Sequence, residues 1–180
     1  MATVPVSVVI LTKNEQHNIR RALMSVRWAA EVIVVDSGST DQTIAIAGEF
    51  ANCRVMQSEW RGYTQTKLIG INAAKHDWIL WLDADEEVSD ELTKSVDRFF
   101  STSPNNHAGA RMRRLTFVRQ KAIYHSGWYP GWTLRLFHRK RCQLVDRTVH
   151  EYVSVNADAQ ISKVVSLDGD MRHFSYPSFE

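Results

Sequence analysis

Short apolar runs recur along the first hundred residues of the chain and are separated by more polar stretches. The runs are rich in Val, Ile, Leu and Trp, which is typical of strands buried on both faces of a sheet. We expect buried strands of this kind at residues 6–11 and 31–35, a third strand near residues 53–57 and a fourth at residues 78–82. The intervening stretches predict helices that begin near Glu15 and after Thr40 or Asp41, and that cover residues 63–75 and 89–100. This alternation predicts a parallel sheet with right-handed crossovers.

After residue 100 the pattern changes from buried runs to alternation. Residues 111–119 alternate apolar and polar side chains, which indicates an antiparallel or edge strand, and residues 121–132 are rich in Gly, Tyr and Trp, as in a loop. Further strands are expected at residues 133–138, 147–155 and 162–167. The length of 180 residues suffices for one substantial core but leaves little room for a second. We therefore predict one α/β domain with a first half, 1–100, and a smaller mixed or antiparallel half, 101–180.

Three of the expected parallel strands end in clusters of polar residues. Ligands of open α/β sheets bind beyond the carboxyl ends of the strands, so clusters that meet at one edge favour a binding site. Helix capping by Asn14 or Asp41 is the alternative for any single cluster. The candidate site residues in these clusters are Thr12, Asn14, Glu15, Asp36, Ser37, Asp83 and Asp85.

Asp83 and Asp85 follow the fourth strand and are separated by one small residue, Ala84. Residues two apart in an extended segment point to the same side, so the two carboxylates can address one point. Oxygen ligands of this kind suit Mg²⁺ or Mn²⁺. The alternative is an acidic helix start, which is the simpler interpretation for the neighbouring Glu86 and Glu87.

The chain lacks the glycine-rich phosphate loops of common nucleotide sites. Neither GxGxxG nor GxxxxGK[ST] occurs, which disfavours dinucleotide-binding and P-loop folds. A diphosphate bound at the strand ends would need a metal, together with a cation such as Lys67 or Arg135. For Lys67, a solvent-exposed helix face remains the open alternative.

Composition and charge further limit the classes of function that fit this chain. The net charge of +2 does not by itself indicate nucleic acid, and the two cysteines have no zinc-motif spacing. No apolar run approaches the roughly 20 residues of a membrane span, so we expect a cytoplasmic protein or one bound peripherally to a membrane. Cations and aromatic residues concentrate in the second half, which suits an anionic membrane surface or a phosphorylated acceptor. No nucleic-acid partner is expected, because a polyanion would face the acidic strand ends.

The segments VSVVILTKNE, EVIVVDSGSTDQT and DWILWLDADEE, in this order and spacing, resemble family 2 of the glycosyltransferases. The resemblance is strongest over residues 6–88 and implies the GT-A fold, a Rossmann-like and mostly parallel central sheet with helices on both faces. The later segments GWYPGWTLRLF and TVHEYV resemble the branch that builds lipopolysaccharide or lipooligosaccharide cores. The Gln/Arg-x-x-Arg-Trp motif of processive synthases is absent, which favours transfer of a single sugar.

The resemblance also implies roles for individual residues. The nucleotide-sugar would be held by Thr12, Asn14, Glu15, Asp36, Ser37, Lys67, Asp83 and Arg135. The metal ligands that the resemblance implies are Asp85, Asp83 and His173. Glu151 would be the general base, with His150 open as an alternative base and a surface ion pair to Arg147 as the non-catalytic interpretation. For His173, a partly buried, hydrogen-bonded histidine is the alternative.

Inversion at an anomeric carbon needs a base on one face of the sugar and stabilisation of the leaving diphosphate on the other. The sequence therefore predicts a metal-dependent, inverting enzyme that moves a hexose from UDP-hexose to a lipid-linked core oligosaccharide, in the cytoplasm or at the inner membrane. A nucleotidyltransferase and a non-catalytic sugar-nucleotide or glycan-binding module remain alternatives. Family members usually continue with a C-terminal helical segment, so the second half is expected to be naturally short or truncated.

Overall fold

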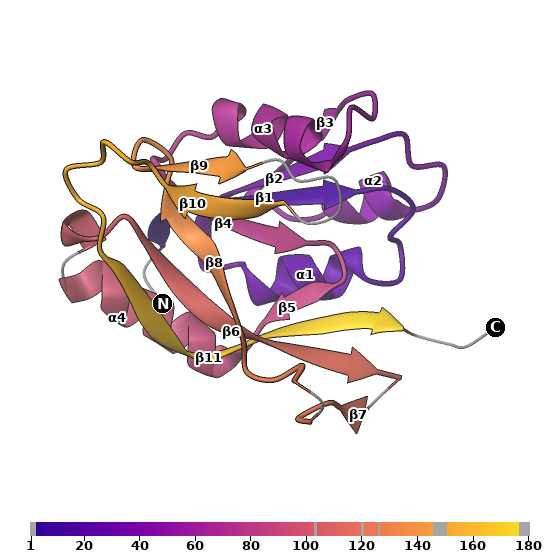
Figure 1. Cartoon of the computed structure of the whole chain (residues 1–180). Helices are drawn as coiled ribbons and strands as arrows, with labels where there is room; N and C mark the ends of the chain where they lie inside the picture. Colours follow the sequence, from indigo (N-terminus) through magenta and orange to yellow (C-terminus); the bar gives the residue numbers. More distant parts are fainter. Residues whose placement is uncertain (1–2, 103, 120, 126, 146–150, 177–180) are drawn as a thin grey trace.

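The computed structural model describes residues 3–102, 104–119, 121–125, 127–145 and 151–176. Within these residues, nine strands form one sheet in the order β3-β2-β1-β4-β8-β6-β11-β5, with β7 paired to β6 (Figure 1). Two further strands, β9 and β10, form a separate antiparallel pair. One main sheet therefore passes through both halves of the chain.

The first half of the chain builds the parallel part of the sheet. β1 (Val4–Thr12) lies between β2 (Ala29–Asp36) and β4 (Trp78–Asp83), and β3 (Cys53–Gln57) lies beside β2. All four strands run parallel, as their apolar runs predict. The helices are α1 (Ile19–Ser25), α2 (Thr43–Ala47), α3 (Tyr63–Ala73) and α4 (Asp90–Thr102), with a 3₁₀ turn at Pro104–Asn106. Among the described residues, no helix is long and apolar enough to span a bilayer.

α1 begins at Ile19 and not near Glu15, where the sequence pattern places it. Asn14 adopts a positive φ of 55°, which interrupts a right-handed helical path. The Glu15 carbonyl then accepts hydrogen bonds from the backbone N–H groups of Asn18 and Ile19. The segment between β1 and α1 is therefore a turn that follows the end of β1.

The second half extends the same sheet. β8 (Gly131–His138) pairs antiparallel with β4, and β6 (Gly109–Val118) pairs antiparallel with β8. β11 (Val164–Tyr176) runs parallel to β6, and β5 (Glu86–Val88) pairs antiparallel with β11. β8 thus connects the parallel strands of the first half to the mixed strands of the second.

The antiparallel strand expected at residues 111–119 is confirmed as β6, which pairs antiparallel with β8. It is not an edge strand, because it lies between β8 and β11. Two of its arginines bond to carboxylates elsewhere in the sheet: Arg113 donates to Asp170 on β11 at 2.9 Å, and Arg114 donates to Glu86 on β5 at 2.9 Å. The alternation therefore reflects in part ion pairs within the sheet.

Short strands account for most of the elements that the sequence pattern does not predict. β5, β7 (Lys121–Ala122) and β9 (Cys142–Val145) have only two to four residues each. β10 (Tyr152–Val155) matches the end of the strand expected at 147–155, of which residues 147–150 lie outside the described residues. β11 begins where expected but continues to Tyr176.

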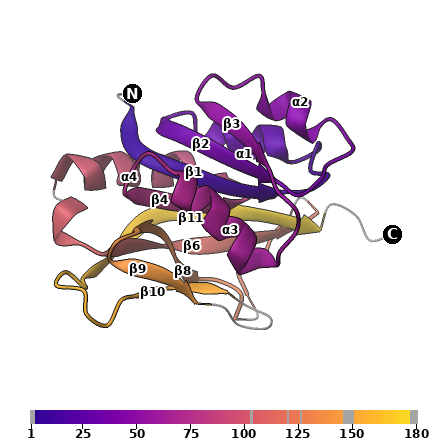
Figure 2. The same cartoon turned by 90° about the horizontal axis from the view of Figure 1, so that it is seen from above.

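Apolar cores on both faces of the sheet confirm the predicted helix-sheet-helix layering. One core joins β1 and β2 to α1 and α4, and the other joins the same strands to α3, β9 and β10. Figure 2 shows α1 and α2 on one side of the molecule and β9 and β10 on the other. In α3, a Cβ on Gly70 would lie 2.5 Å from Cγ1 of Val9. The missing side chain therefore allows α3 to pack directly on β1.

Candidate active site

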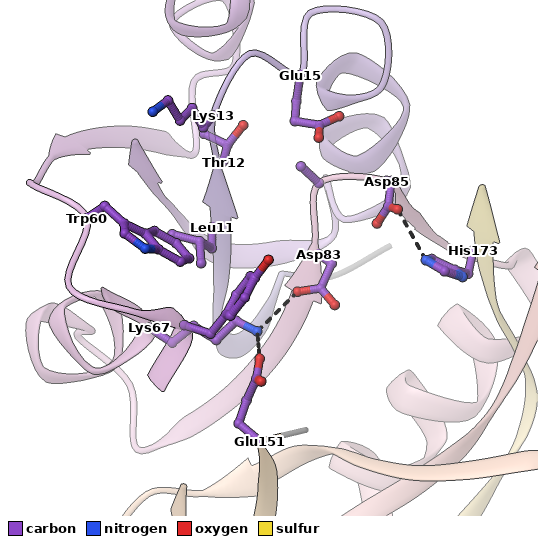
Figure 3. A pocket seen from close by; sticks show the side chains of 12 residues that line it. Leu11, Thr12, Lys13, Glu15, Trp60, Lys67, Asp83, Asp85, Glu151 and His173 are labelled. Atoms are coloured by element: carbon purple, nitrogen blue, oxygen red, sulfur yellow. Dashed lines mark hydrogen bonds and ion pairs between the residues drawn. The ribbon is translucent and has the colours of Figure 1, made fainter. Parts of the chain in front are cut away.

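A cavity of about 640 Å³ opens at the carboxyl ends of β1 and β4 (Figure 3). The parallel register sets Leu11 of β1 beside Asp83 of β4, so both strand-end clusters reach the same edge of the sheet, as predicted. Side chains from α3 and from the segment before β10 complete the wall. The lining residues are Leu11, Thr12, Lys13, Glu15, Trp60, Tyr63, Lys67, Asp83, Ala84, Asp85, Glu151 and His173.

Asp83 is bound by cations from two sides. Lys67 Nζ lies 3.4 Å from its Oδ1, and Arg135 Nη2 lies 3.1 Å from its Oδ2. The indole N–H of Trp81 donates a further hydrogen bond at 2.9 Å. Burial opposes ionisation of this carboxyl, but the cations of Arg135 and Lys67 outweigh it and hold the pKa of Asp83 well below its usual range. Asp83 is therefore a carboxylate at neutral pH.

Lys67 is not on a solvent-exposed helix face, which was the alternative left open by the sequence. Only 3% of its side chain is exposed. Its Nζ donates to Glu151 Oε1 at 2.6 Å and lies 3.5 Å from the ring centroid of Trp81. A buried ammonium is stable when it is paired in this way. Lys67 therefore joins Glu151 to Asp83 across the floor of the cavity (Figure 3).

Glu86 is a buried member of the same charge network, and its prediction as part of a helix start is wrong. Its Oε1 accepts from Arg114 Nε at 2.9 Å and from Arg135 Nη2 at 3.2 Å. Its Oε2 accepts from the backbone N–H of Asp83 at 3.0 Å. Because two arginines from β6 and β8 balance its charge, Glu86 can stay buried and fix the position of Asp83.

Asp85 has a different partner from Asp83. Its Oδ2 lies 3.1 Å from Nε2 of His173 on β11, and both side chains line the cavity (Figure 3). Burial raises the pKa of nearby Glu15, and the negative charge of Asp85 adds to this effect. The region around Asp85 is thus rich in negative charge and would favour a cation.

A carboxylate beside an imidazole suits a divalent cation that takes its remaining ligands from substrate oxygens. Among the described residues, no three His, Cys, Asp or Glu side chains gather to hold a metal by themselves. The structure therefore brings Asp85 and His173 together but engages Asp83 with two cations instead. Asp85 and His173 could therefore supply two ligands to a divalent cation.

Other predicted site residues lie outside the lining of this cavity. The Asp36 carboxylate accepts from the N–H groups of Gly38 and Ser39, at 3.0 and 2.9 Å. Asn14 Oδ1 accepts from the Thr40 N–H at 2.8 Å. Ser37 is buried, and its Oγ has no hydrogen-bond partner among the described residues. Asp36 and Asn14 therefore hold the loop after β2 in place beside the cavity.

Five lining residues were not among the predicted site residues: Leu11, Lys13, Trp60, Tyr63 and Ala84. The rings of Trp60 and Tyr63 meet edge to face at 4.8 Å, and the two residues are 50% and 60% exposed. A tryptophan within the polar loop 58–62, just before a helix, was the signal that could have found them. Exposed aromatic rings at a cavity mouth are suited to stacking on a base or a sugar.

The mixed sheet with helices on both faces and a charged cavity at the strand ends is the GT-A fold, which confirms the predicted fold. The model of the family "Glycosyl transferase family 2" matches residues 7–157. The chain belongs to this family.

Relatives of this chain agree with that assignment. An uncharacterized glycosyltransferase of Rickettsia bellii is 34% identical over 186 residues, which cover all of this chain and 63% of that protein. The lipopolysaccharide core biosynthesis glycosyltransferase LpsC of Rhizobium meliloti is 30% identical over 118 residues, 63% of this chain and 43% of LpsC. This chain therefore spans less than two thirds of the length of these relatives.

Solved structures with this fold include two glycosyltransferases. S. aureus TarS 1-349 in complex with UDP-GlcNAc superposes with a TM-score of 0.69 at 18% identity, covering 97% of this chain and 60% of TarS. The mannosyltransferase PcManGT of Pyrobaculum calidifontis, in complex with GDP-Man and Mn²⁺, gives 0.51 at 21% identity and covers 65% and 37% of the two chains.

Proposed function

We propose that this glycosyltransferase moves a hexose, with inversion, from UDP-hexose to a core oligosaccharide of the lipopolysaccharide type. The observation that carries the proposal is the position of Glu151 in the same cavity as the Asp85–His173 pair. Inversion is a single displacement, in which base and leaving group act on opposite faces of the sugar. A carboxylate and a cation site that share one cavity supply both parts.

The cavity suits a nucleotide-sugar as the donor. Its volume of about 640 Å³ lies within the range of pockets for ligands of this size. Trp60 and Tyr63 offer aromatic faces at its mouth. TarS was solved with UDP-GlcNAc and PcManGT with GDP-Man, which supports a nucleotide diphosphate carrier. We assign the donor side to the first half of the domain, 1–100.

A divalent cation, Mg²⁺ or Mn²⁺, would be held by Asp85 and His173. When bound, it would neutralise negative charge on the diphosphate as that group leaves. Mn²⁺ in the PcManGT complex supports this choice. Asp83, paired with Lys67 and Arg135, would then act through hydrogen bonds to the donor and not as a metal ligand.

Glu151 would act as the general base. Its carboxylate takes the proton of an acceptor hydroxyl while the bond from that oxygen to the anomeric carbon forms and the bond to the diphosphate breaks. Lys67 holds Oε1 of Glu151 at 2.6 Å, which leaves Oε2 to receive the proton. The other candidate base, His150, lies outside the described residues.

The acceptor belongs to the second half of the domain, 101–180, in this proposal. LpsC, by its name, acts in lipopolysaccharide core biosynthesis, which supports a lipid-linked core oligosaccharide as acceptor. Such an acceptor would bring the protein to the cytoplasmic face of the inner membrane as a peripheral protein.

The test of the donor site is calorimetric titration with UDP, first with Mn²⁺ and then with EDTA. We expect EDTA, or Asp85→Ala in the presence of Mn²⁺, to weaken UDP binding at least about tenfold, which corresponds to about 1.4 kcal/mol. Asp158→Ala, at an exposed turn, is the control and should bind like the wild type. If neither EDTA nor Asp85→Ala changes the affinity for UDP, the metal has no part in donor binding. If UDP does not bind under any of these conditions, the proposed UDP-hexose donor is wrong.

A further inference from the structure

A second hollow of about 390 Å³ lies beside the cavity and shares His173 with it. We name it the Trp128/Trp132 hollow, after the two most exposed of its residues. β6 and β8 form it at the edge of the sheet where β4 ends, because β8 is antiparallel to β4 and therefore begins there. Its lining residues are Arg114, Thr116, Trp128, Gly131, Trp132, Thr133 and His173.

The two tryptophans are too exposed to be core residues. Trp128 is 49% and Trp132 is 41% exposed. Leaving large aromatic surface in water costs free energy, and its concentration at a concave site marks a place where a ligand covers it. Flat aromatic faces suit the C–H faces of a pyranose ring.

A polar group without a partner lines the same hollow. Thr133 Oγ1 is buried and has no hydrogen-bond partner among the described residues. Buried hydroxyl groups normally find a partner, so a ligand that carries hydroxyl groups would satisfy this one.

The charge of the hollow favours a neutral ligand over a phosphate. Arg114, the arginine in its lining, is neutralised by the buried Glu86 at 2.9 Å. Arg135 is likewise balanced by Asp83 and Glu86. A phosphate would have to compete with these carboxylates for the same guanidinium groups, whereas a sugar hydroxyl would not.

We propose that the Trp128/Trp132 hollow binds a neutral pyranose ring of the acceptor glycan, stacked on the tryptophans and hydrogen-bonded to Thr133. This inference rests on the proposed function, because it takes the adjoining cavity as the donor site. The shared His173 then marks the junction between donor and acceptor, where the new glycosidic bond would form.

The test uses the indole N–H signals of the six tryptophans in NMR spectra of the whole chain, assigned with Trp→Phe variants. The probes are methyl glycosides of glucose, galactose and heptose. Glucitol, which carries hydroxyl groups but no ring, is the matched control, and inorganic phosphate tests the anionic alternative. We expect the glycosides, and neither control, to shift the signals of Trp128 and Trp132 in a saturable way.

The outcomes separate the inference from the function on which it rests. UDP with Mg²⁺ should shift the indole signal of Trp60, and an unchanged Trp60 signal would count against the proposed donor site alone. The inference would be overturned, even when UDP binds, by either of two results. The signals of Trp128 and Trp132 do not shift with any glycoside, or they shift with phosphate instead.

A turnover experiment gives a second measurement. Trp132→Ala and Thr133→Val should each raise the acceptor KM by about tenfold, while hydrolysis of the UDP-hexose by water should stay within about twofold. Met24→Ala, at an exposed position in a separate hollow, is the control and should change neither. An unchanged acceptor KM in both variants would contradict the assignment.

Discussion

At the scale of single residues, Lys67 is the side chain on which the geometry of the site depends most. It is almost completely buried and contacts two carboxylates that come from separate segments of the chain, Asp83 and Glu151. The ring of Trp81 supports its ammonium group at 3.5 Å, a distance at which a cation is attracted to an aromatic face. Without Lys67, the carboxylates of Asp83 and Glu151 would have less positive charge beside them to balance their negative charge.

Lys67→Met should therefore lower the free energy of unfolding by about 3–5 kcal/mol, the usual cost of removing one partner of a buried ion pair. Urea unfolding at pH 7 measures this change. Lys75→Met, at an exposed lysine, should stay within about 0.5 kcal/mol of the wild type. Equal midpoints for both variants would show that the ion pairs of Lys67 add nothing to stability.

Glu151→Gln should lower kcat by about 10²–10⁴, because the amide cannot accept the proton of the acceptor hydroxyl. The affinity for UDP should change little, since the glutamine can still accept the hydrogen bond from Lys67. Turnover with a UDP-hexose and calorimetry with UDP measure the two effects. A Glu151→Gln enzyme with full kcat would exclude Glu151 as the base, and Glu59→Gln, at an exposed position, serves as the control.

Much of the site follows from the sequence because strand-end polar residues must meet at one sheet edge. Asp83, Asp85 and Glu15 reach one cavity in this way. Glu86 was misjudged because its burial depends on Arg114 and Arg135, which belong to strands far along the chain. Such pairings leave no local signal in the sequence.

At the scale of elements, the contact between α3 and β1 depends on the absence of a side chain at Gly70. A Cβ there would lie 2.5 Å from Val9 Cγ1 and 2.9 Å from Val35 Cγ2. Gly70→Ala should therefore destabilise the protein by about 1–3 kcal/mol through overpacking, despite the better helix propensity of alanine. Gly48→Ala is the matched control, because the nearest atom to its Cβ would be 3.5 Å away, and it should be neutral or stabilising. Thermal or urea unfolding measures both.

The side chain of Glu31, on β2, forms hydrogen bonds to three other segments: β1, β3 and the residues before β4. Its buried carboxylate accepts from Ser7 on β1 at 2.6 Å, from Arg54 on β3 at 3.0 Å and from the Lys75 N–H before β4 at 2.9 Å. Burial opposes ionisation, but these hydrogen bonds and the charge of Arg54 lower the pKa of Glu31 overall. A carboxyl whose pKa is lowered on folding stabilises the fold above its unfolded pKa, about 4.3, and loses this contribution as the pH falls.

Glu31→Gln should therefore be less stable than the wild type at pH 7, and the difference should narrow near pH 3.5. Urea unfolding at the two pH values measures it. Asp158→Asn, at an exposed carboxylate, should track the wild type at both. A constant difference between Glu31→Gln and the wild type would mean that the Glu31 charge does not contribute.

The elements predicted best are those whose sequence carries its own pattern. The buried strands β1, β2 and β4 match their apolar runs, since two covered faces demand continuous apolar residues. β5 and β9 are short and depend on partners elsewhere, β11 and β10 respectively. No stretch of three or four residues encodes such a pairing by itself.

At the scale of the whole molecule, the two halves share one sheet through the pairing of β4 with β8. The same strand, β8, brings Arg135 to Asp83 and Trp132 to the second hollow. The cavity and the Trp128/Trp132 hollow are therefore parts of one continuous structure, and a change in the pairing of β8 would affect both.

This arrangement also bears on how the chain is synthesised. Residues up to 102 contain all four parallel strands, but β8, the partner of β4, begins only at Gly131. A nascent chain that has just completed α4 therefore exposes the open edge of the apolar strand Trp78–Asp83, which invites pairing with other chains. Until the chain has been extended to His138, the last residue of β8 that pairs with β4, the incomplete protein would depend on dilution or on a chaperone to stay monomeric.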